Sequence, residues 1–345
     1  MRRYDIDWLR VIVLGLLIIY HSTISFMPFG IKIFFPQNKQ TLEILWFVMA
    51  LINIWRIPLL FIISGMAVCF SMKRRNWKEM FKDRGLRIMA PYIFGLLVIC
   101  PISFLFQSIF YGTEILYIPN PGHLWFLYNI WVYFCCLIAL FVYLQKNPNN
   151  ILLNFLRKIF MYRLGIYIMV IPFVIEGIFI SPDSYASYAS TIHGWVLGLI
   201  CFLTGYIFIL LKENFWDAVV RVKNIALMIA FVLYFVRVIL LEFVELHPLT
   251  AMESYSWMIS IFGFAAKFLN KKSIRLSYLS TAVYPIYIIH MPLQFFFSLY
   301  IIPVDMPAIL KLILIIISTL ISSFAIYDLI IKRLKWIRPL FGLKI

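Results

Sequence analysis

Two ionisable residues in the first apolar segment have the types and the spacing to carry chemistry. Arg10 and His21 both fall in the apolar run from Trp8 to Phe26. Their separation corresponds to about three turns of α-helix, so the two side chains share a face and lie ~16 Å apart along the axis. Ionisable groups inside a bilayer usually face a cavity or a partner. The spacing therefore predicts a polar stripe through most of the membrane.

These two residues have different candidate roles. A histidine is well suited to proton transfer near neutral pH, so His21 is a candidate general base. Its alternative is a hydrogen-bonded structural histidine. For Arg10 the alternative is an interfacial anchor whose charged end extends to the lipid surface.

The remaining histidines are His123, His193, His247 and His290. With the N-terminus in the cytoplasm, every histidine of the chain falls in the outer half of the predicted membrane region. Neither an HxxxH nor an HExxH spacing occurs, so the pattern predicts no metal site.

A dense basic segment runs from Lys73 to Arg87 (KRRNWKEMFKDRGLR). Within it, Arg84 and Arg87 are three residues apart at the start of a predicted helix, so they share a face. Two guanidinium groups in this arrangement suit a phosphate-bearing ligand. The alternative is that the segment only determines topology and attracts anionic membrane lipids.

The second apolar segment contains another candidate charge. Pro58 and the pair Ser64-Gly65 are expected to interrupt its helix, and irregular backbone at membrane depth lines protein or a cavity. Arg56 lies just before Pro58 and is a candidate cavity residue. A hydrogen-bonded arginine in a kinked helix is the alternative.

Ionisable residues of later segments are expected to pair. Arg237, Glu242 and Glu176 lie in or near the outer half of predicted spans. Pairing of Arg237 with Glu242, or pairing across helices, is the simplest explanation because isolated charges are costly there.

Composition identifies the elements that must position these residues. The chain has 345 residues, of which 63% are apolar and 13% charged, and a mean hydropathy of +0.94. Average soluble proteins carry about 45–50% apolar and about 25% charged residues, so a soluble enzyme is excluded. The net charge of +16 indicates basic cytoplasmic loops rather than a nucleic-acid partner. The cysteines show no CxxC pair and are expected to act as small hydrophobes.

The apolar runs predict an all-α polytopic protein in the cell (inner or plasma) membrane. One transmembrane domain over residues 1–345 is expected, with about ten spans at 8–26, 42–72, 88–110, 124–144, 164–180, 192–211, 224–243, 254–269, 277–300 and 308–331. In this arrangement 25 Lys and Arg residues lie on one side and two on the other. The positive-inside rule then places both termini in the cytoplasm. The first run is interpreted as a retained helix because no cleavage site follows it.

Four groups of segments together resemble the integral-membrane acyltransferase family 3. They are DWLRVIVLGLLIIYH with Arg10 and His21 as R-x10-H, FIISGMAV with Ser64-Gly65, RGLRIMAPY with Arg84 and Arg87 as R-x-x-R, and the pair GHLWFL and YPIYIIHMP. The last pair is most similar to the branch that contains the glucan biosynthesis protein C. In one respect the chain departs from the family: many members have a Glu a few residues after the W-x-L motif, whereas no acidic residue occurs here from Trp125 to Ile130.

The resemblance implies an O-acyltransferase that moves an acetyl or succinyl group from cytoplasmic acyl-CoA to a hydroxyl of an extracytoplasmic glycan. His21 would act as general base, and Arg10 would hold the donor along the helix. Arg84 and Arg87 would bind the anionic nucleotide end of CoA. The acceptor side would involve Arg56, His123, Trp125 and His290, with Arg56 or His290 as candidate oxyanion stabilisers. No bound cofactor is expected.

Two alternatives stay open from the sequence. Many spans with intramembrane Arg and His also suit a transporter or flippase of a glycan or lipid-linked sugar. The acceptor of an acyl transfer could also be a lipid or another small molecule. The spans show no clear inverted repeat, and the R-x-x-R motif has no evident role in export, which favours acyl transfer.

Overall fold

The computed structural model describes residues 2–73 and 76–344. These residues form helices and loops, and none of them is in a β-strand. The predicted all-α fold is therefore confirmed. Arg74 and Arg75 of the basic segment lie outside the described residues.

Within the described parts of the chain, eight helices are long and apolar enough to span a membrane. They are Tyr4–Ile24, Leu45–Met72, Trp77–Tyr111, Gly122–Lys146, Ile192–Leu210, Glu213–Leu240, Ile274–Ile301 and Ala308–Ile331. They coincide with eight of the predicted spans. The other two predicted spans correspond to Gly165–Ile180, which is shorter, and to the more polar helix His247–Phe268. That these two also cross the membrane stays a prediction.

The helices follow one another with short connections. The α-helices are α1 (Tyr4–Ile24), α2 (Leu45–Met72), α3 (Trp77–Arg84), α4 (Ala90–Phe94), α5 (Cys100–Tyr111), α6 (Trp125–Lys146), α7 (Ile151–Phe160), α8 (Ile171–Ile180), α9 (Ile192–Leu210), α10 (Glu213–Phe235), α11 (His247–Phe268), α12 (Ile274–Ile301) and α13 (Ala308–Ile326). Turns of 3₁₀ helix are η1 (Gly30–Ile33), η4 (Gly122–Leu124), η5 (Gly165–Val170) and η8 (Lys335–Phe341), and π turns are η2 (Gly85–Met89), η3 (Gly95–Ile99), η6 (Val236–Leu240) and η7 (Tyr327–Ile331).

The chain divides into two compact units. Unit 1 comprises residues 1–9, 50–81 and 129–272, and unit 2 comprises residues 10–49, 82–128 and 273–345. Each unit is assembled from segments that are distant in the sequence, so α1 contributes its first residues to unit 1 and the rest to unit 2.

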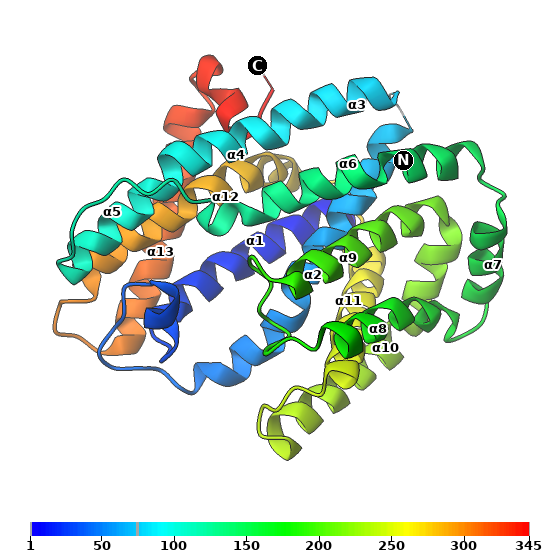
Figure 1. The fold of residues 1–345 in the computed structure, drawn as a ribbon, viewed down its shortest axis with the longest axis horizontal. Coiled ribbons are helices and arrows are strands. Elements are labelled where there is room, and N and C mark those ends of the chain that lie inside the picture. Colours follow the sequence, from blue (N-terminus) through cyan, green and yellow to red (C-terminus); the bar gives the residue numbers. More distant parts are fainter. Residues whose placement is uncertain (1, 74–75, 345) are drawn as a thin grey trace. The chain divides into compact units, whose positions relative to one another are not determined.

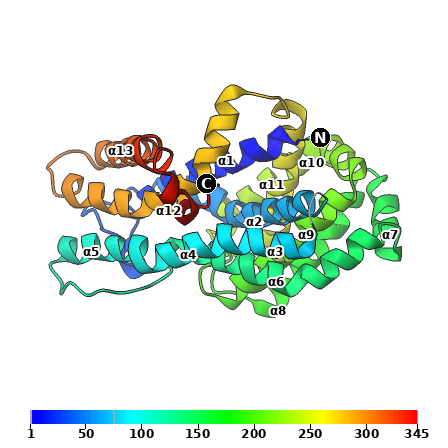
Figure 2. The same cartoon turned by 90° about the horizontal axis from the view of Figure 1, so that it is seen from above.

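In unit 2, α12 lies between α5 and α13, as both views show (Figures 1 and 2). Two apolar clusters hold this unit together around α1, α12 and α13. One contains Phe35 and Phe295, and the other contains Phe26 and Ile315. Van der Waals packing of these large side chains stabilises the unit, because helices within lipid gain no hydrophobic driving force from burial.

In unit 1, α2 and α9 cross closely at two glycines. A Cβ at Gly65 would meet the carbonyl oxygen of Phe202 at 1.9 Å, and one at Gly205 would meet that of Ile62 at 1.9 Å. Small residues allow this close approach of two apolar helices. The expectation of an interrupted second span is therefore wrong: α2 continues through Pro58, and Gly65 serves helix packing.

Candidate active site

His21 and His290 form a hydrogen-bonded pair inside unit 2. His21 is near the C-terminal end of α1, and His290 is on α12. The Nδ1 atom of His21 lies 2.9 Å from Nε2 of His290, and the two rings are nearly parallel, at an interplanar angle of 3°. His290 is fully buried, whereas His21 is partly exposed. His21 is therefore the more accessible member of the pair.

The hydrogen-bond partners determine which ring nitrogens carry protons. Nδ1 of His290 lies 2.7 Å from the carbonyl oxygen of Tyr287. A carbonyl only accepts, so this nitrogen carries the proton. Nε2 of a neutral His290 is then an acceptor, and Nδ1–H of His21 donates to it. In this tautomer the other ring nitrogen of His21, Nε2, carries no proton, and a general base needs such an unprotonated nitrogen.

A third histidine is fixed to the same turn of α12. Nε2 of His123 lies 3.0 Å from the carbonyl oxygen of Tyr287 and 3.2 Å from that of Ile288. Pro292 has no N–H and leaves the Ile288 carbonyl without its usual helical donor, so His123 takes that place. The Tyr287 hydroxyl donates in return to the His123 carbonyl at 2.6 Å. His123 therefore ties η4 to α12 and positions the turn that carries His290.

At the other end of unit 2, three arginines gather. Arg84 interacts electrostatically with both Arg10 and Arg87, so the guanidinium groups of α1 and of the α3–η2 junction lie near one another. Arg87 also pairs with Asp83, at 3.2 Å between Nε and Oδ1. Because like charges repel, a bound anion would reduce the repulsion between these guanidinium groups.

The arginine cluster is linked to the histidine helix by Tyr284. Its hydroxyl donates to the carbonyl oxygen of Arg87 at 3.0 Å, and Tyr284 lies six residues before His290 on α12. Arg87 lies in the π turn η2, a form of helix that often accompanies functional sites. The same helix thus carries His290 and contacts the backbone of the arginine cluster.

The remaining predicted site residues are placed as follows. Trp125 opens α6, two residues after His123, and is partly buried. Arg56 is buried on α2 and belongs to unit 1. Their predicted roles on the acceptor side stay predictions. Among the described residues, no group of three or more His, Cys, Asp or Glu side chains could hold a metal ion.

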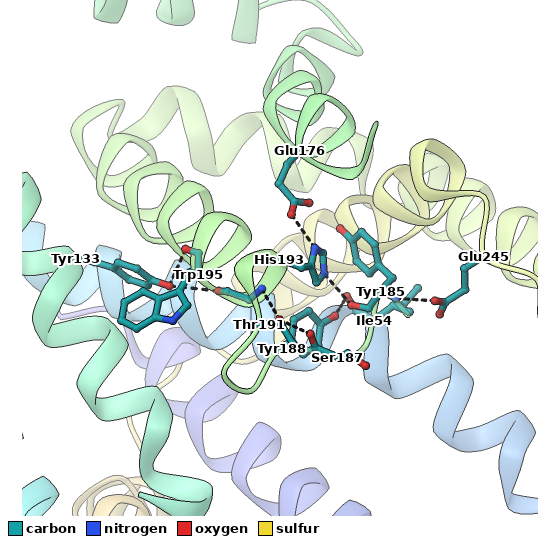
Figure 3. Close-up of polar contacts among 11 residues, drawn as sticks. Ile54, Tyr133, Glu176, Tyr185, Ser187, Tyr188, Thr191, His193, Trp195 and Glu245 are labelled. Carbon is teal, nitrogen blue, oxygen red and sulfur yellow. Dashed lines mark hydrogen bonds and ion pairs between the residues drawn. The ribbon is translucent and has the colours of Figure 1, made fainter. Parts of the chain in front are cut away.

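A second polar cluster lies in unit 1 (Figure 3). His193 at the start of α9 contacts the Glu176 carboxylate through Nδ1 at 2.7 Å and the Tyr185 carbonyl through Nε2 at 3.0 Å. Both nitrogens are therefore occupied, so His193 cannot serve as a free base. It instead connects α8 to the loop before α9. Burial raises the pKa of the loop residues Tyr185 and Tyr188 well above the usual value, so both phenols stay neutral.

The predicted pairing of Arg237 with Glu242 is wrong, whereas the alternative of pairing across helices is correct. Arg237 forms two hydrogen bonds to Glu253 on α11, at 2.7 and 2.9 Å. The reason lies in the backbone, since Glu242 follows the π turn η6 with a positive φ of 46° and is exposed.

Sequence reasoning did not identify Gln294, Ser298 or Ser22 as functional candidates. All three are fully buried in unit 2. A usable signal existed on α12, where polar residues recur every four positions from His290 through Gln294 to Ser298. Such spacing places them on one face of a helix.

Comparison with known proteins identifies the family of the chain. A family model described as an acyltransferase domain matches residues 3–328. No curated protein and no solved structure matches the chain. Because the family match covers nearly the whole chain, the protein belongs to this acyltransferase family, and its apolar helices make it a multi-pass membrane acyltransferase.

Proposed function

We propose that this acyltransferase moves an acetyl or succinyl group from cytoplasmic acyl-CoA to a hydroxyl group of an extracytoplasmic glycan. The observation that carries the proposal is the hydrogen-bonded His21–His290 pair, in which His290 is fully buried and His21 is partly exposed. The arginine cluster of Arg10, Arg84 and Arg87 is the second support, since CoA is strongly anionic at its nucleotide end.

The arrangement fits a long donor that reaches through the membrane domain. Arg10 and His21 lie on the continuous helix α1, about 16 Å apart along its axis. The pantetheine arm of CoA has a comparable length. With its phosphates at Arg84 and Arg87, the donor would present its thioester near His21, and Arg10 would lie along its path.

The chemical step follows from the proton positions. Nε2 of His21 takes the proton of the acceptor hydroxyl while the hydroxyl oxygen attacks the thioester carbonyl. A C–O bond forms, the tetrahedral intermediate collapses and the C–S bond breaks. The proton passes from His21 to the departing sulfur, which leaves as CoA thiol. During the step, the hydrogen bond from the His21 imidazolium to His290 becomes charge-assisted and therefore stronger.

Donor binding tests the arginine cluster. We expect replacement of Arg84 and Arg87 by Ala to weaken binding of CoA by at least about tenfold, because each lost charge-assisted hydrogen bond contributes roughly 1.5–3 kcal/mol. Titration of purified protein in nanodiscs with acetyl-CoA, CoA and pantetheine measures this. Replacement of Lys271 and Lys272, two basic residues of unit 1, is the matched control. Unchanged affinity in the arginine variant would contradict the donor site.

A further inference from the structure

A row of buried polar side chains continues from the histidine pair along α12. His290, Gln294 and Ser298 are spaced four residues apart, so they lie on one face with about 6 Å between successive levels. Gln294 and Ser298 are fully buried. On α1, Ser25 follows His21 by the same four residues and lies 3.4 Å from Gln294, between its Oγ and the amide Nε2.

The two helices are therefore in register at two levels. His21 meets His290 at the first level and Ser25 meets Gln294 at the second. Beyond Ser298, the carbonyl oxygen of Ile302 accepts a hydrogen bond from the buried ammonium of Lys311 at 2.7 Å. The polar row thus runs from the histidine pair to the loop end of α12, which the charge distribution predicts to be the outer side.

Several atoms of this row have no hydrogen-bond partner. They are Oε1 of Gln294, Oγ of Ser298 and Oγ of Ser22, which is next to His21 on α1. Whichever way the Gln294 amide is turned, one of its two polar atoms stays without a partner. Buried polar groups of this kind are costly unless a ligand or water supplies the missing hydrogen bond.

The side chains around Gln294 and Ser298 are apolar and cannot supply the missing hydrogen bonds. Met291 and Phe295, which flank this face of α12, belong to an apolar cluster with Phe35 and Ile24. Such surroundings offer no alternative hydrogen bonds. An amide and a hydroxyl that project from one helix face beside a general base have the chemistry to bind neighbouring hydroxyl groups of a substrate.

We propose that Gln294 and Ser298 form an acceptor subsite, which binds hydroxyl groups next to the one that reacts at His21. The inference rests on the proposed acyl transfer and specifies its acceptor as a polyhydroxyl compound. Gln294 and Ser298 act on acceptor binding, not on the thioester. A simple alcohol has no second hydroxyl and gains nothing from them.

The test compares two acceptors in the variants Gln294→Leu and Ser298→Ala. With acetyl-CoA as donor, each variant should raise the KM for maltotriose by about tenfold, the effect of one lost hydrogen bond that leaves a partner unpaired. The KM for 1-propanol should rise much less than the KM for maltotriose, because 1-propanol has no second hydroxyl group to bind. An unchanged KM for maltotriose in both variants, or equal changes for both acceptors, would overturn the subsite.

Ser323→Ala provides a matched control. Ser323 on α13 is also fully buried and its Oγ has no partner. Its neighbour Phe324 stacks on Tyr278 at 6.3 Å between ring centroids, and Tyr278 lies about 18 Å before His290 along α12. A rise in the maltotriose KM in this variant equal to that of Ser298→Ala would contradict the proposal.

Direct binding separates this proposal from the proposed function. Binding of maltotriose to the protein in nanodiscs, measured by saturation-transfer NMR without donor, should weaken in Gln294→Leu and Ser298→Ala. Maltotriose binding that depends on these residues, without any cleavage of acetyl-CoA or succinyl-CoA, would support the subsite and contradict acyl transfer. Cleavage of acetyl-CoA without binding or acylation of maltotriose would contradict the subsite alone.

Discussion

At the scale of single residues, the tautomer of His21 is set through a carbonyl oxygen that His21 does not touch. The Tyr287 carbonyl fixes the proton of His290 on Nδ1, and His290 in turn fixes the proton of His21 on Nδ1. A base held in one tautomer by a second group is a recurring device in nucleophilic catalysis. In this chain the second group is a neutral histidine.

His290 is therefore expected to act as a positioning residue. In His290→Asn, the amide oxygen can still accept from His21, so kcat should fall by less than about tenfold; in His290→Leu it should fall by at least about a hundredfold, within the range of general-base contributions. The KM for acyl-CoA should stay unchanged in both. Steady-state kinetics at saturating acceptor measure kcat for the two variants. Equal losses of kcat in His290→Asn and His290→Leu would contradict the positioning role.

Sequence reasoning named His21 and His290 as candidates but did not predict that the two residues are in contact. The spacing of Arg10 and His21 predicts their common face correctly because both lie on one uninterrupted helix. The contacts of His21 with His290 join residues 269 positions apart, and no local pattern contains them. The role of His123 depends on the carbonyl of Ile288, which has no helical donor because Pro292 lacks an N–H. His123 lies in η4, and only the folded structure shows that η4 contacts this carbonyl of α12.

At the scale of elements, the segment after α13 packs against α12, the helix that carries His290. Ile337 and Phe341 of η8 are buried, and Phe341 packs edge-on against Phe94 at 5.5 Å. Gly342 ends η8 with a φ of +68°, and a Cβ there would come within 2.0 Å of the Tyr284 ring. Both the backbone conformation and the space therefore require glycine at this position.

Gly342→Ala should consequently destabilise the protein. A left-handed non-glycine residue costs roughly 1–3 kcal/mol, and the contact with Tyr284 adds to it. Gly112→Ala is the matched control, since Gly112 has a φ of +64° but no atom within 4 Å of the added Cβ. Thermal unfolding of both variants in the same detergent should show the larger loss of Tm for Gly342→Ala, and equal losses would contradict the role of the contact.

The elements also show why some predictions from the sequence were incomplete. Helix boundaries were predicted well where apolar runs are long, as in α9 and α13. The predicted interruption of α2 is wrong because α9 packs against it at Gly65, a tertiary contact that a proline and a glycine in sequence do not reveal. The π turns η2, η3, η6 and η7 likewise have no sequence signature that distinguishes them from ordinary helix.

At the scale of the whole molecule, the charge distribution predicts the orientation. In the predicted arrangement of ten spans, 25 basic residues on one side against two on the other would place the arginine cluster in the cytoplasm and His21 toward the outer surface. This orientation puts a cytoplasmic donor and an external acceptor on the correct sides of the proposed reaction.

Cysteine labelling tests the orientation. In a variant with its native cysteines replaced, Lys39→Cys should react with a membrane-impermeant maleimide in intact cells, because Lys39 is exposed in a predicted outer loop. Lys271→Cys, exposed in a predicted inner loop, should react only after permeabilisation. The opposite pattern would reverse the membrane orientation and contradict a cytoplasmic donor site.

The most direct test of the central claim is CoA release by the purified protein. The protein in nanodiscs is incubated with acetyl-CoA or succinyl-CoA, and free thiol is measured for the unchanged chain, for His21→Ala and for the control His247→Ala. We predict cleavage of at least one donor, a loss of at least about a hundredfold in His21→Ala, and little change in His247→Ala. Cleavage at the same rate in His21→Ala, or failure of the folded protein to bind either donor, would contradict the account.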